Sequence, residues 1–418
     1  MKRKKKCFLV LFLCLSATSG AQVSLEQCYD SARVNYPLIR QQKLLEATRQ
    51  FTLENIKKAF VPQVSLSARA SWQSDVTEIP FQVPGVRIDG MEQDQYQFLL
   101  ELKQQVYDGG MVRARKDLQQ AATDADLRQM EVDMYVLRQR IDEVYFGVLL
   151  HTAKLKQMQL LTDQLQKSRQ LVDAFLKRGV ACQADVDAVT VELHTARQSE
   201  RAVRISREAY CEVLSLLTGI SSLQPEHLSV PETAGLIEEN RRPELQLFDQ
   251  KKAVLEAQRK SIVAGIRPTL GIFMQGAYGD PGLNMLRGGF RPYYIGGVQL
   301  SWNFGKFYTF KNDKRLISEQ MKQVDVQRDL FLLNTRAEMI QARAEVDRIR
   351  QEIEDDEEII RLRGQIRRSA ESRVSNGTLS VLDMLRMVLD EDQARQSKAT
   401  HEIELLQAQY RMKRIWNN

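Results

Sequence analysis

Two long stretches of the chain contain no proline and almost no glycine. Proline is absent from residues 85–224 and 293–418, and within them residues 111–178 and 306–376 hold one glycine each. Both residue types interrupt helices, proline because it lacks a backbone donor and glycine because ordering it costs conformational entropy. The two stretches are instead rich in Gln, Glu, Arg, Lys, Ala and Leu, which favour helix. They predict two helices of about 70 residues, each roughly 100 Å long at about 1.5 Å per residue.

Cysteine and histidine are scarce, with five and four in 418 residues. Cys28, Cys182 and Cys211 remain once the first 21 residues are set aside, and this odd, scattered set predicts no disulfide framework. The four histidines lack the spacing of metal ligands, and the chain has no phosphate loop and no nucleophile elbow. The acidic run 352–358 is interpreted as a solvated helix face. We therefore predict no metal, no cofactor and no catalytic residue, and an enzyme is the least favoured class.

Positive charge is concentrated at the start of the chain, where Lys and Arg occupy positions 2–6. Eleven mostly apolar residues, 7–17, follow, and Ser-Gly-Ala ends at residue 21. Such a stretch is too short for a bilayer-spanning helix of about 20 residues, so residues 1–21 are predicted to be a cleaved signal peptide rather than an anchor. Removal of five cations lowers the net charge from +6 to +1 (6 − 5), which leaves nucleic-acid binding without support.

The sequence contains two similar copies, each beginning with a pair of prolines 25 residues apart (62 − 37 and 268 − 243). The pairs are Pro37 with Pro62 and Pro243 with Pro268. Behind each pair come an alternating strand-like run, a loop, a second such run and a long helical stretch. We therefore predict two structural repeats, in which Pro62 and Pro268 mark the change from helix to strand. The repeats are residues 22–223 and residues 224–418.

Shorter helices are predicted before and after each long one. The two short helices of a repeat together nearly match the long helix in length, so they can run antiparallel along it and cover its apolar seam. Each copy also has a glycine six residues before an aspartate, Gly179 before Asp185 and Gly377 before Asp383. The predicted short helices are residues 25–60 and 183–217 in the first copy, and residues 239–264 and 381–416 in the second.

Four segments alternate between apolar and polar residues. In the first of them Val64, Leu66 and Trp72 share one face, and Ser65 and Ser67 share the other. Segments of about ten residues with one apolar face and aromatic ends are typical of transmembrane β-strands. A soluble sandwich is the alternative, but four strands leave no second sheet to pack against. The predicted strands are residues 61–72, 94–106, 268–279 and 292–304.

Four strands are too few to close a barrel. Spanning barrels need at least about eight strands, and an open sheet edge is not tolerated in lipid. Several copies must therefore share one barrel, for which two copies would supply eight strands and three would supply twelve. The residues alone do not decide between these numbers.

The order of several short motifs resembles that of the TolC-type outer-membrane efflux proteins. The motifs are NYPLI, FVPQVSLSA, VYDGG, RGVACQADV, LLTG, RRPEL, LSWNFGK and NGTLSVLDML. The resemblance covers residues 21–416 and implies an α+β membrane protein that forms a homotrimer. Its twelve-stranded β-barrel would span the outer membrane of a Gram-negative bacterium, in contact with lipid, and continue through the periplasm as a long α-helical coiled-coil tunnel. It also implies that a periplasmic adaptor of an inner-membrane pump docks on the tunnel.

The resemblance places the gate of the channel at the periplasmic tip, where the helical hairpins turn. Gly179 and Gly377 correspond to the glycines of the two turns. Asp185 matches an aspartate of the gating polar network, and Asp383 matches the first of two aspartates that form cation-sensitive rings. Rings of carboxylates focus a negative potential that attracts cations. The alternative is that Asp383 is simply a helix N-terminal charge that opposes the dipole.

The chain departs from the family pattern close to Asp383. Arg386 occupies the position of the second ring acid, and Val374 and Leu379 replace polar members of the gate. An arginine cannot extend an acidic ring. It either pairs with Asp383 or Asp185 and latches the tip closed, or it is an ordinary solvated helix residue.

The function that the resemblance implies is a passive duct that exports small molecules such as drugs from the periplasm or the pump to the exterior. A duct for type I protein secretion is a close alternative that the sequence does not separate from it. A soluble periplasmic coiled-coil scaffold would explain the helices and the signal peptide but not the four amphipathic strands. Cargo and pump are not evident from the sequence, because the pump selects the substrate.

Overall fold

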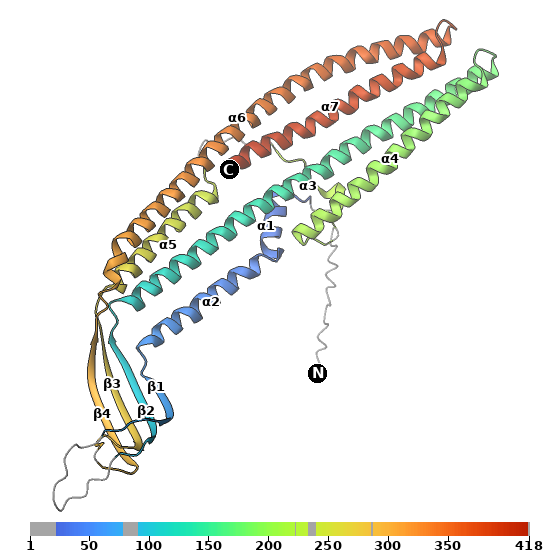
Figure 1. Cartoon of the computed structure of the whole chain (residues 1–418). Coiled ribbons are helices and arrows are strands. Elements are labelled where there is room, and N and C mark those ends of the chain that lie inside the picture. Colours follow the sequence, from blue (N-terminus) through green and yellow to red (C-terminus); the bar gives the residue numbers. More distant parts are fainter. Residues whose placement is uncertain (1–21, 78–90, 222, 233–239, 286, 417–418) are drawn as a thin grey trace, which may run out of the picture. The chain divides into compact units, whose positions relative to one another are not determined.

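The computed structural model describes residues 22–77, 91–221, 223–232, 240–285 and 287–416. Seven α-helices, two short 3₁₀ helices and four β-strands occur in these residues (Figure 1). The predicted signal peptide, residues 1–21, lies outside them. The chain forms two compact units, which we call the sheet unit and the helical unit. The sheet unit is Arg40–Asp133 with Arg242–Asn334, and the helical unit is the described part of Met1–Ile39, Met134–Arg241 and Thr335–Asn418.

The sheet unit contains one antiparallel sheet in the order β1-β2-β3-β4. Its strands are β1 Gln63–Trp72, β2 Asp94–Tyr107, β3 Thr269–Asp280 and β4 Arg291–Ser301. The first repeat supplies β1 and β2 and the second supplies β3 and β4, so the central β2–β3 pairing joins the two repeats. Each edge strand, β1 or β4, has a single partner in the described chain. A mostly helical chain with one small antiparallel sheet is confirmed.

One face of the sheet is apolar and exposed. The register places Leu66 of β1 opposite Leu100 of β2, and Val298 of β4 shares their face. Leu66 is 76% exposed. The opposite face is polar, as where Gln275 Nε2 donates to Glu101 Oε1 at 2.6 Å. The alternation along the strands therefore separates an apolar face from a hydrogen-bonded one.

The last strand ends three residues before the end of its predicted range, 292–304. Asn303 Oδ1 accepts a hydrogen bond from the backbone N–H of Gly305 at 3.0 Å, which turns the chain before the next helix. Trp302 donates from its indole Nε1 to the carbonyl of Ile266 at 2.9 Å. The alternation of apolar and polar residues continues into this turn, so the predicted strand extended beyond the last residue that pairs in the sheet. The other three strands begin and end within two residues of their predicted ranges.

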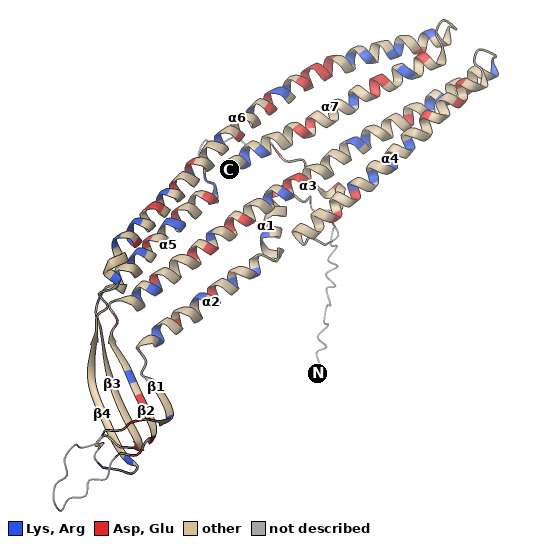
Figure 2. Ribbon diagram, viewed as in Figure 1, with Lys and Arg blue, Asp and Glu red and all other residues tan. Residues whose placement is uncertain are grey.

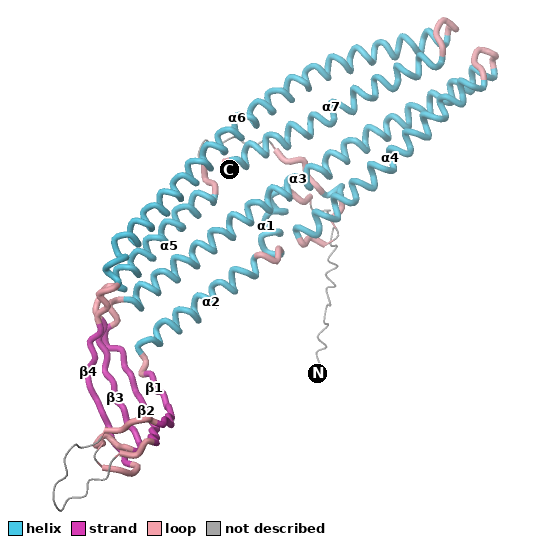
Figure 3. Tube along the Cα trace, in the orientation of Figure 1, coloured by secondary structure: helices cyan, strands magenta, loops and turns pink. Residues whose placement is uncertain are grey.

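Each strand is joined to a helix by a short connection (Figure 3). The helices α2 (Ile39–Lys57) and α5 (Pro243–Gly265) precede β1 and β3, while α3 (Met111–Lys177) and α6 (Lys306–Ser375) follow β2 and β4. Pro62 lies between α2 and β1, and Pro268 lies between α5 and β3. At these positions the missing backbone N–H leaves no helical or ladder hydrogen bond unmade.

The turn between β2 and α3 requires glycine. Gly109 and Gly110 have φ values of 73° and 90°, in the left-handed region that other residues rarely adopt. A Cβ at Gly109 would lie 3.0 Å from the carbonyl oxygen of Ala264. Asp108 fixes the turn by accepting from the N–H of Gly110 at 2.9 Å. The VYDGG motif is thus explained by backbone geometry at the base of the sheet.

The first predicted short helix, residues 25–60, is wrong as a single helix. The chain forms α1 (Leu25–Asn35) and then α2, with Pro37 between them. Proline disfavours helical φ and ψ in the residue before it, and Tyr36 accordingly takes an extended conformation at φ −65° and ψ 135°. In the second repeat Pro243 instead stands at the first position of α5, where its missing N–H costs nothing.

The helical unit holds α1, the distal parts of α3 and α6, and the returning helices α4 (Gln183–Thr218) and α7 (Val381–Ile415). We call α3 with α4 the first hairpin and α6 with α7 the second hairpin. Charged residues occur along all of these helices (Figure 2). No helix in the described ranges combines the length and the apolar character needed to cross a membrane. A buried apolar cluster that includes Cys28, Tyr145 and Cys211 packs α1 against α3 and α4.

Candidate functional site

The two hairpins turn at the predicted glycines. Gly179 lies between α3 and α4 with φ of 73°, and Gly377 lies between α6 and α7 with φ of 70°. Both are in the left-handed conformation that commonly ends a helix. Their N–H groups donate to the carbonyls of Leu176 and Val374, at 3.0 and 2.9 Å. No atom lies within 4 Å of the Cβ that either glycine lacks, so backbone conformation and not space requires glycine there.

Asp185 and Asp383 occupy equivalent places in the first turns of α4 and α7. Asp185 accepts a hydrogen bond from the backbone N–H of Cys182 at 2.9 Å. Asp383 donates its own N–H to Ser380 Oγ at 3.1 Å, and Ser380 Oγ donates in return to Asp383 Oδ2 at 2.7 Å. Both carboxylates thus stabilise a helix N-terminus, where the dipole favours negative charge. Within the described chain no hydrogen bond joins the two aspartates.

Arg386 is exposed on α7, one turn beyond Asp383. It makes no ion pair with any described residue of its own chain. The latch that would join it to Asp383 or Asp185 is therefore not formed within a single protomer. Its guanidinium remains available to solvent or to another copy.

Apolar packing holds the two turns together inside the helical unit. Val374, which replaces a polar residue of the family gate, is 3% exposed. It lies in a buried cluster with Phe175, Val186 and Val381, so the cluster draws on α3, α4, α6 and α7. Leu379 packs against the same cluster. Both departures from the polar pattern thus extend the core towards the turns.

The second hairpin is crossed by ion pairs that the sequence analysis did not predict. Glu391 of α7 is 5% exposed and accepts from two arginines. Arg367 Nε on α6 lies 2.5 Å from Glu391 Oε2, and Arg395 Nη2 lies 2.6 Å from Glu391 Oε1. Arg363 of α6 also binds Asp390 of α7 at 2.6 Å. These partners are separated by 24 and 27 residues, so no local pattern indicates them.

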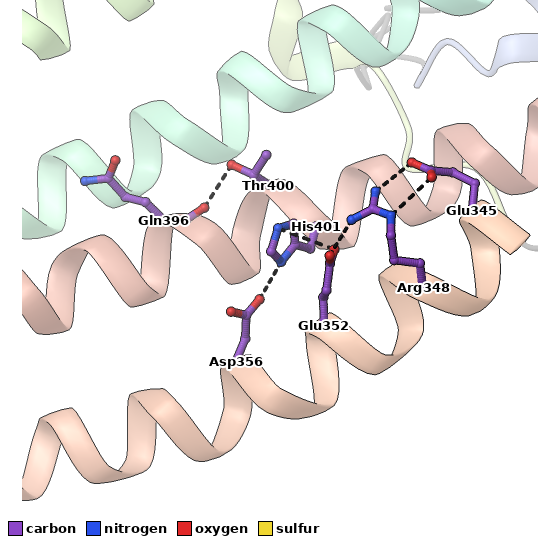
Figure 4. Close-up of polar contacts among 7 residues, drawn as sticks. All are labelled: Glu345, Arg348, Glu352, Asp356, Gln396, Thr400 and His401. Carbon is purple, nitrogen blue, oxygen red and sulfur yellow. Dashed lines mark hydrogen bonds and ion pairs between the residues drawn. The ribbon is translucent and has the colours of Figure 1, made fainter.

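A second polar group lies further along the same hairpin (Figure 4). His401 Nδ1 of α7 lies 2.6 Å from Asp356 Oδ2 of α6, and Asp356 is 6% exposed. Arg348 binds Glu345 at 2.7 Å and also Glu352. The interpretation of residues 352–358 as a purely solvated face is therefore wrong at Asp356, which faces α7. Among the described residues no group has the composition and geometry to hold a metal ion.

In the described residues of the first hairpin, no ion pair joins α3 to α4. Between the described residues of α3 and α4 a hydrogen bond of 3.4 Å runs from Arg197 Nη2 to Gln166 Oε1, and the rings of His151 and Tyr210 lie 5.0 Å apart. Its packing is apolar, as at Leu165, Val189 and Leu193. The two repeats share a backbone plan but hold their hairpins by different means, one by apolar contacts and the other by buried charge as well.

Asp392 gives the second hairpin a dependence on pH. Burial raises the pKa of Asp392 to about 6. The unfolded carboxyl has a pKa of about 3.9, so the folded state binds this proton more tightly than the unfolded state does. The resulting contribution to the free energy of unfolding is fully present below about pH 4 and is lost as the pH rises through 6. Asp392→Asn removes the buried charge and leaves an oxygen for Gln396, which donates to it. We expect a gain of about 1–2 kcal/mol at pH 7.5, allowing for solvent screening, and none at pH 4.

Thermal unfolding of the purified protein at the two pH values measures this effect. Asp347→Asn is the matched control, because Asp347 lies exposed on α6 and should change little at either pH. A lower melting temperature of Asp392→Asn at pH 7.5 would show that the ionised carboxylate is needed there.

The first copy of the sequence matches a known family. Residues 28–219 fit the family model described as outer membrane efflux protein. Over these residues the chain is similar to the outer membrane efflux protein family. This stretch contains the first hairpin, its turn and the strands β1 and β2. No curated protein sequence matches this chain.

Solved outer-membrane proteins share the fold over nearly the whole chain. VceC from Vibrio cholerae is 13% identical with a TM-score of 0.66, and the match covers 93% of this chain and 96% of VceC. The CmeC outer membrane channel of Campylobacter jejuni is 14% identical with a TM-score of 0.66, covering 94% and 85%. CusC, described in terms of transmembrane channel formation, is 14% identical with a TM-score of 0.69, covering 92% and 90%. At such identities the likeness shows the fold.

The family and the shared fold decide several expectations. The family match and the shared fold support a location in the outer membrane. The resemblance to TolC-type channels is confirmed, and both comparisons favour a channel over an enzyme. The roles of Asp185, Asp383, Arg386 and the turn glycines stay predictions.

Proposed function

We propose that three copies of this protein form the outer-membrane duct of a tripartite export system. The observation that carries the proposal is the sheet, which has four strands, one apolar exposed face and, among the described residues, an unpaired edge on β1 and on β4. Unpaired backbone groups are too costly in lipid, so each edge would pair with the next copy. Three chains supply twelve strands, enough to enclose a pore.

The helices would continue the pore into the periplasm. In this arrangement α3 and α6, of 67 and 70 residues, form the wall of the tunnel and extend roughly 100 Å at about 1.5 Å per residue. The hairpin turns would then lie at the periplasmic end, where a periplasmic adaptor and an inner-membrane pump dock. The cargo is a small molecule such as a drug. Type I protein secretion is the second candidate, and the identity of the co-purifying pump distinguishes the two.

The entrance would be ringed by the aspartates of the hairpin turns. Three copies bring six carboxylates, from Asp185 and Asp383 (2 × 3), to the narrow end of the duct. The capping hydrogen bonds of both residues hold their side chains in fixed positions at helix ends. Arg386 would add three cations one turn away and pair with carboxylates of a neighbouring copy. This ion pair between copies would hold the entrance closed.

Planar-bilayer recordings of the purified protein test the duct and its entrance together. The wild type should give discrete conductance steps, and their absence would contradict the proposal. Asp383→Asn should weaken block by divalent cations roughly tenfold, because it removes three charges from the entrance. Arg386→Ser should raise the leak conductance. Asp347→Asn serves as control, and block unchanged by Asp383→Asn would leave that residue only its capping role.

A further inference from the structure

A basic groove lies at the base of the sheet, between α5 and the first turns of α6. It has a volume of about 420 Å³. Four cations contribute to its lining: Arg259 of α5 and Lys311, Lys314 and Arg315 of α6. The ring of Phe310 forms part of its wall, and Lys314 Nζ lies 5.4 Å from the centre of that ring. All of these residues belong to the sheet unit.

Most of the positive charge in the groove is uncompensated. Arg259 pairs with Glu256 at 2.6 Å. Lys311, Lys314 and Arg315 make no ion pair with any described residue. Further along α6, by contrast, Lys322 pairs with Glu319 at 2.8 Å. Three free cations beside one aromatic ring favour an anionic ligand with an apolar part.

A chain of aromatic rings connects the groove to the apolar face of the sheet. Trp302 continues the alternation of Val298 and Leu300, so it belongs to that face. Its ring lies 4.9 Å from that of Phe304, which in turn lies 6.4 Å from that of Phe307 in the first turn of α6. Rings of this kind gather at the boundary between hydrocarbon and water.

Helical spacing continues this face from Phe307 into the groove. Residues four, seven and eleven positions further along a helix lie on the same side. These positions are Lys311, Lys314 and Ser318, and all three line the groove. At about 1.5 Å per residue the two lysines lie roughly 6 and 10 Å beyond Phe307, a depth that matches the layer of lipid headgroups.

We propose that this groove binds the phosphodiester headgroup of an acidic phospholipid in the periplasmic leaflet of the outer membrane. Its acyl chains would lie along the aromatic rings and the apolar face of the sheet, and its phosphate would contact Lys311, Lys314 and Arg315. The inference rests on the proposed function, because it needs the sheet to cross the bilayer with α6 on the periplasmic side.

Two of the cations in the groove, Lys314 and Arg315, have no charged counterpart in the first repeat. The long helices begin at Met111 and Lys306, so equivalent positions differ by 195 (306 − 111). Lys314 and Arg315 correspond to Gln119 and Gln120 in the first repeat. One acidic lipid per chain, and three per trimer, is therefore the expected number. The first repeat also shows that this helix position accommodates glutamine, which gives a substitution compatible with the fold.

Native mass spectrometry of the mature protein in detergent measures the binding. Dioleoylphosphatidylglycerol should bind the wild type more tightly than dioleoylphosphatidylcholine does. Because each cation near a membrane surface contributes roughly fivefold, the double variant Lys314→Gln/Arg315→Gln should bind the phosphatidylglycerol about 25-fold more weakly. Binding of the phosphatidylcholine should be the same in both proteins. Lys322→Gln is the matched control, since it removes a cation of α6 that already has a partner.

Three results would overturn the lipid site. The first is equal phosphatidylglycerol affinity in the double variant and the wild type. The second is displacement of the lipid by millimolar inorganic phosphate, which would indicate a small-anion site. The third is loss of the oligomer in the double variant, which would assign the groove to contact between copies. Conductance recordings of the same wild-type preparation distinguish failure of the lipid site from failure of the duct. If conductance steps occur but the protein shows no lipid preference, only the lipid site is overturned. If conductance steps are absent, the proposed duct is overturned.

Discussion

Leu66→Arg is expected to abolish assembly of the protein in the outer membrane, whereas Ser67→Arg should be tolerated. The two residues are neighbours near the middle of β1 and face opposite sides of the sheet. Leu66 lies on the exposed apolar face, opposite Leu100, and Ser67 lies on the polar face. The comparison keeps the strand, the depth and the introduced side chain constant and changes only the face.

The size of the effect follows from the cost of placing arginine in lipid. On the outer face of a barrel near the bilayer centre an arginine costs about 2–4 kcal/mol, and the proposed trimer would bear this cost three times. On the inner face the same side chain remains in water. A difference of this size far exceeds the typical effect of an exposed substitution, which is about 0.5 kcal/mol or less.

The amount of detergent-extracted oligomer in outer-membrane fractions measures assembly. We expect little or none for Leu66→Arg and a wild-type amount for Ser67→Arg. Wild-type assembly of Leu66→Arg would show that this face does not contact lipid. Failure of Ser67→Arg alone would show that the two faces had been assigned the wrong way round.

The second large effect is expected at Glu391. Glu391→Ala leaves Arg367, which is itself half-buried, without the carboxylate at 2.5 Å. Removal of one partner from a buried pair is strongly destabilising, because the remaining charge is no longer compensated. Arg367 keeps an ion pair with Glu371 at 2.5 Å, which offsets part of the loss. We therefore expect a destabilisation of about 3 kcal/mol, at the lower end of the range for buried pairs.

Glu358→Ala is the matched control for this experiment. Glu358 pairs with Arg361 at 2.5 Å on the exposed side of α6, and such pairs contribute about 0–1 kcal/mol. Urea or thermal unfolding of both variants gives the comparison. Equal, small losses would mean that the ion pairs between α6 and α7 do not stabilise the second hairpin.

The long helices and the strands were predictable because each depends on local sequence. The absence of proline over residues 111–178 and 306–376 allows uninterrupted helix, and α3 and α6 fill nearly all of these ranges. Alternation of apolar and polar residues likewise identifies the apolar face and the polar face of each strand directly. The break at Pro37 was missed although its signal was local, because the helical pattern around it outweighed the proline.

Contacts across the second hairpin were not predictable in the same way. Asp356 and His401 are 45 residues apart, and Arg367 and Glu391 are 24 apart. Their pairing depends on the rotation of two helices about their axes, which is set by the packing of the whole unit. Within a run of acids such as 352–358, the sequence gives no means of telling the buried carboxylate from the exposed ones.

The candidate entrance shows both situations. The glycines of the turns could be located from the sequence, because each helix ends with a residue in the left-handed backbone conformation, which glycine adopts most readily. The aspartates also have a local explanation as helix caps, so their position within one chain does not require a ring of charge. Arg386 makes no ion pair with an acid in the described part of its own chain, and the proposed partner lies in a neighbouring copy.

The number of chains in the purified protein tests the central claim most directly. Native mass spectrometry of the mature chain, extracted from outer membranes in detergent, should give three copies, because three four-stranded sheets are needed for twelve strands. A complex of two copies, or a single chain that stays in solution without detergent, would contradict the shared barrel and with it the duct.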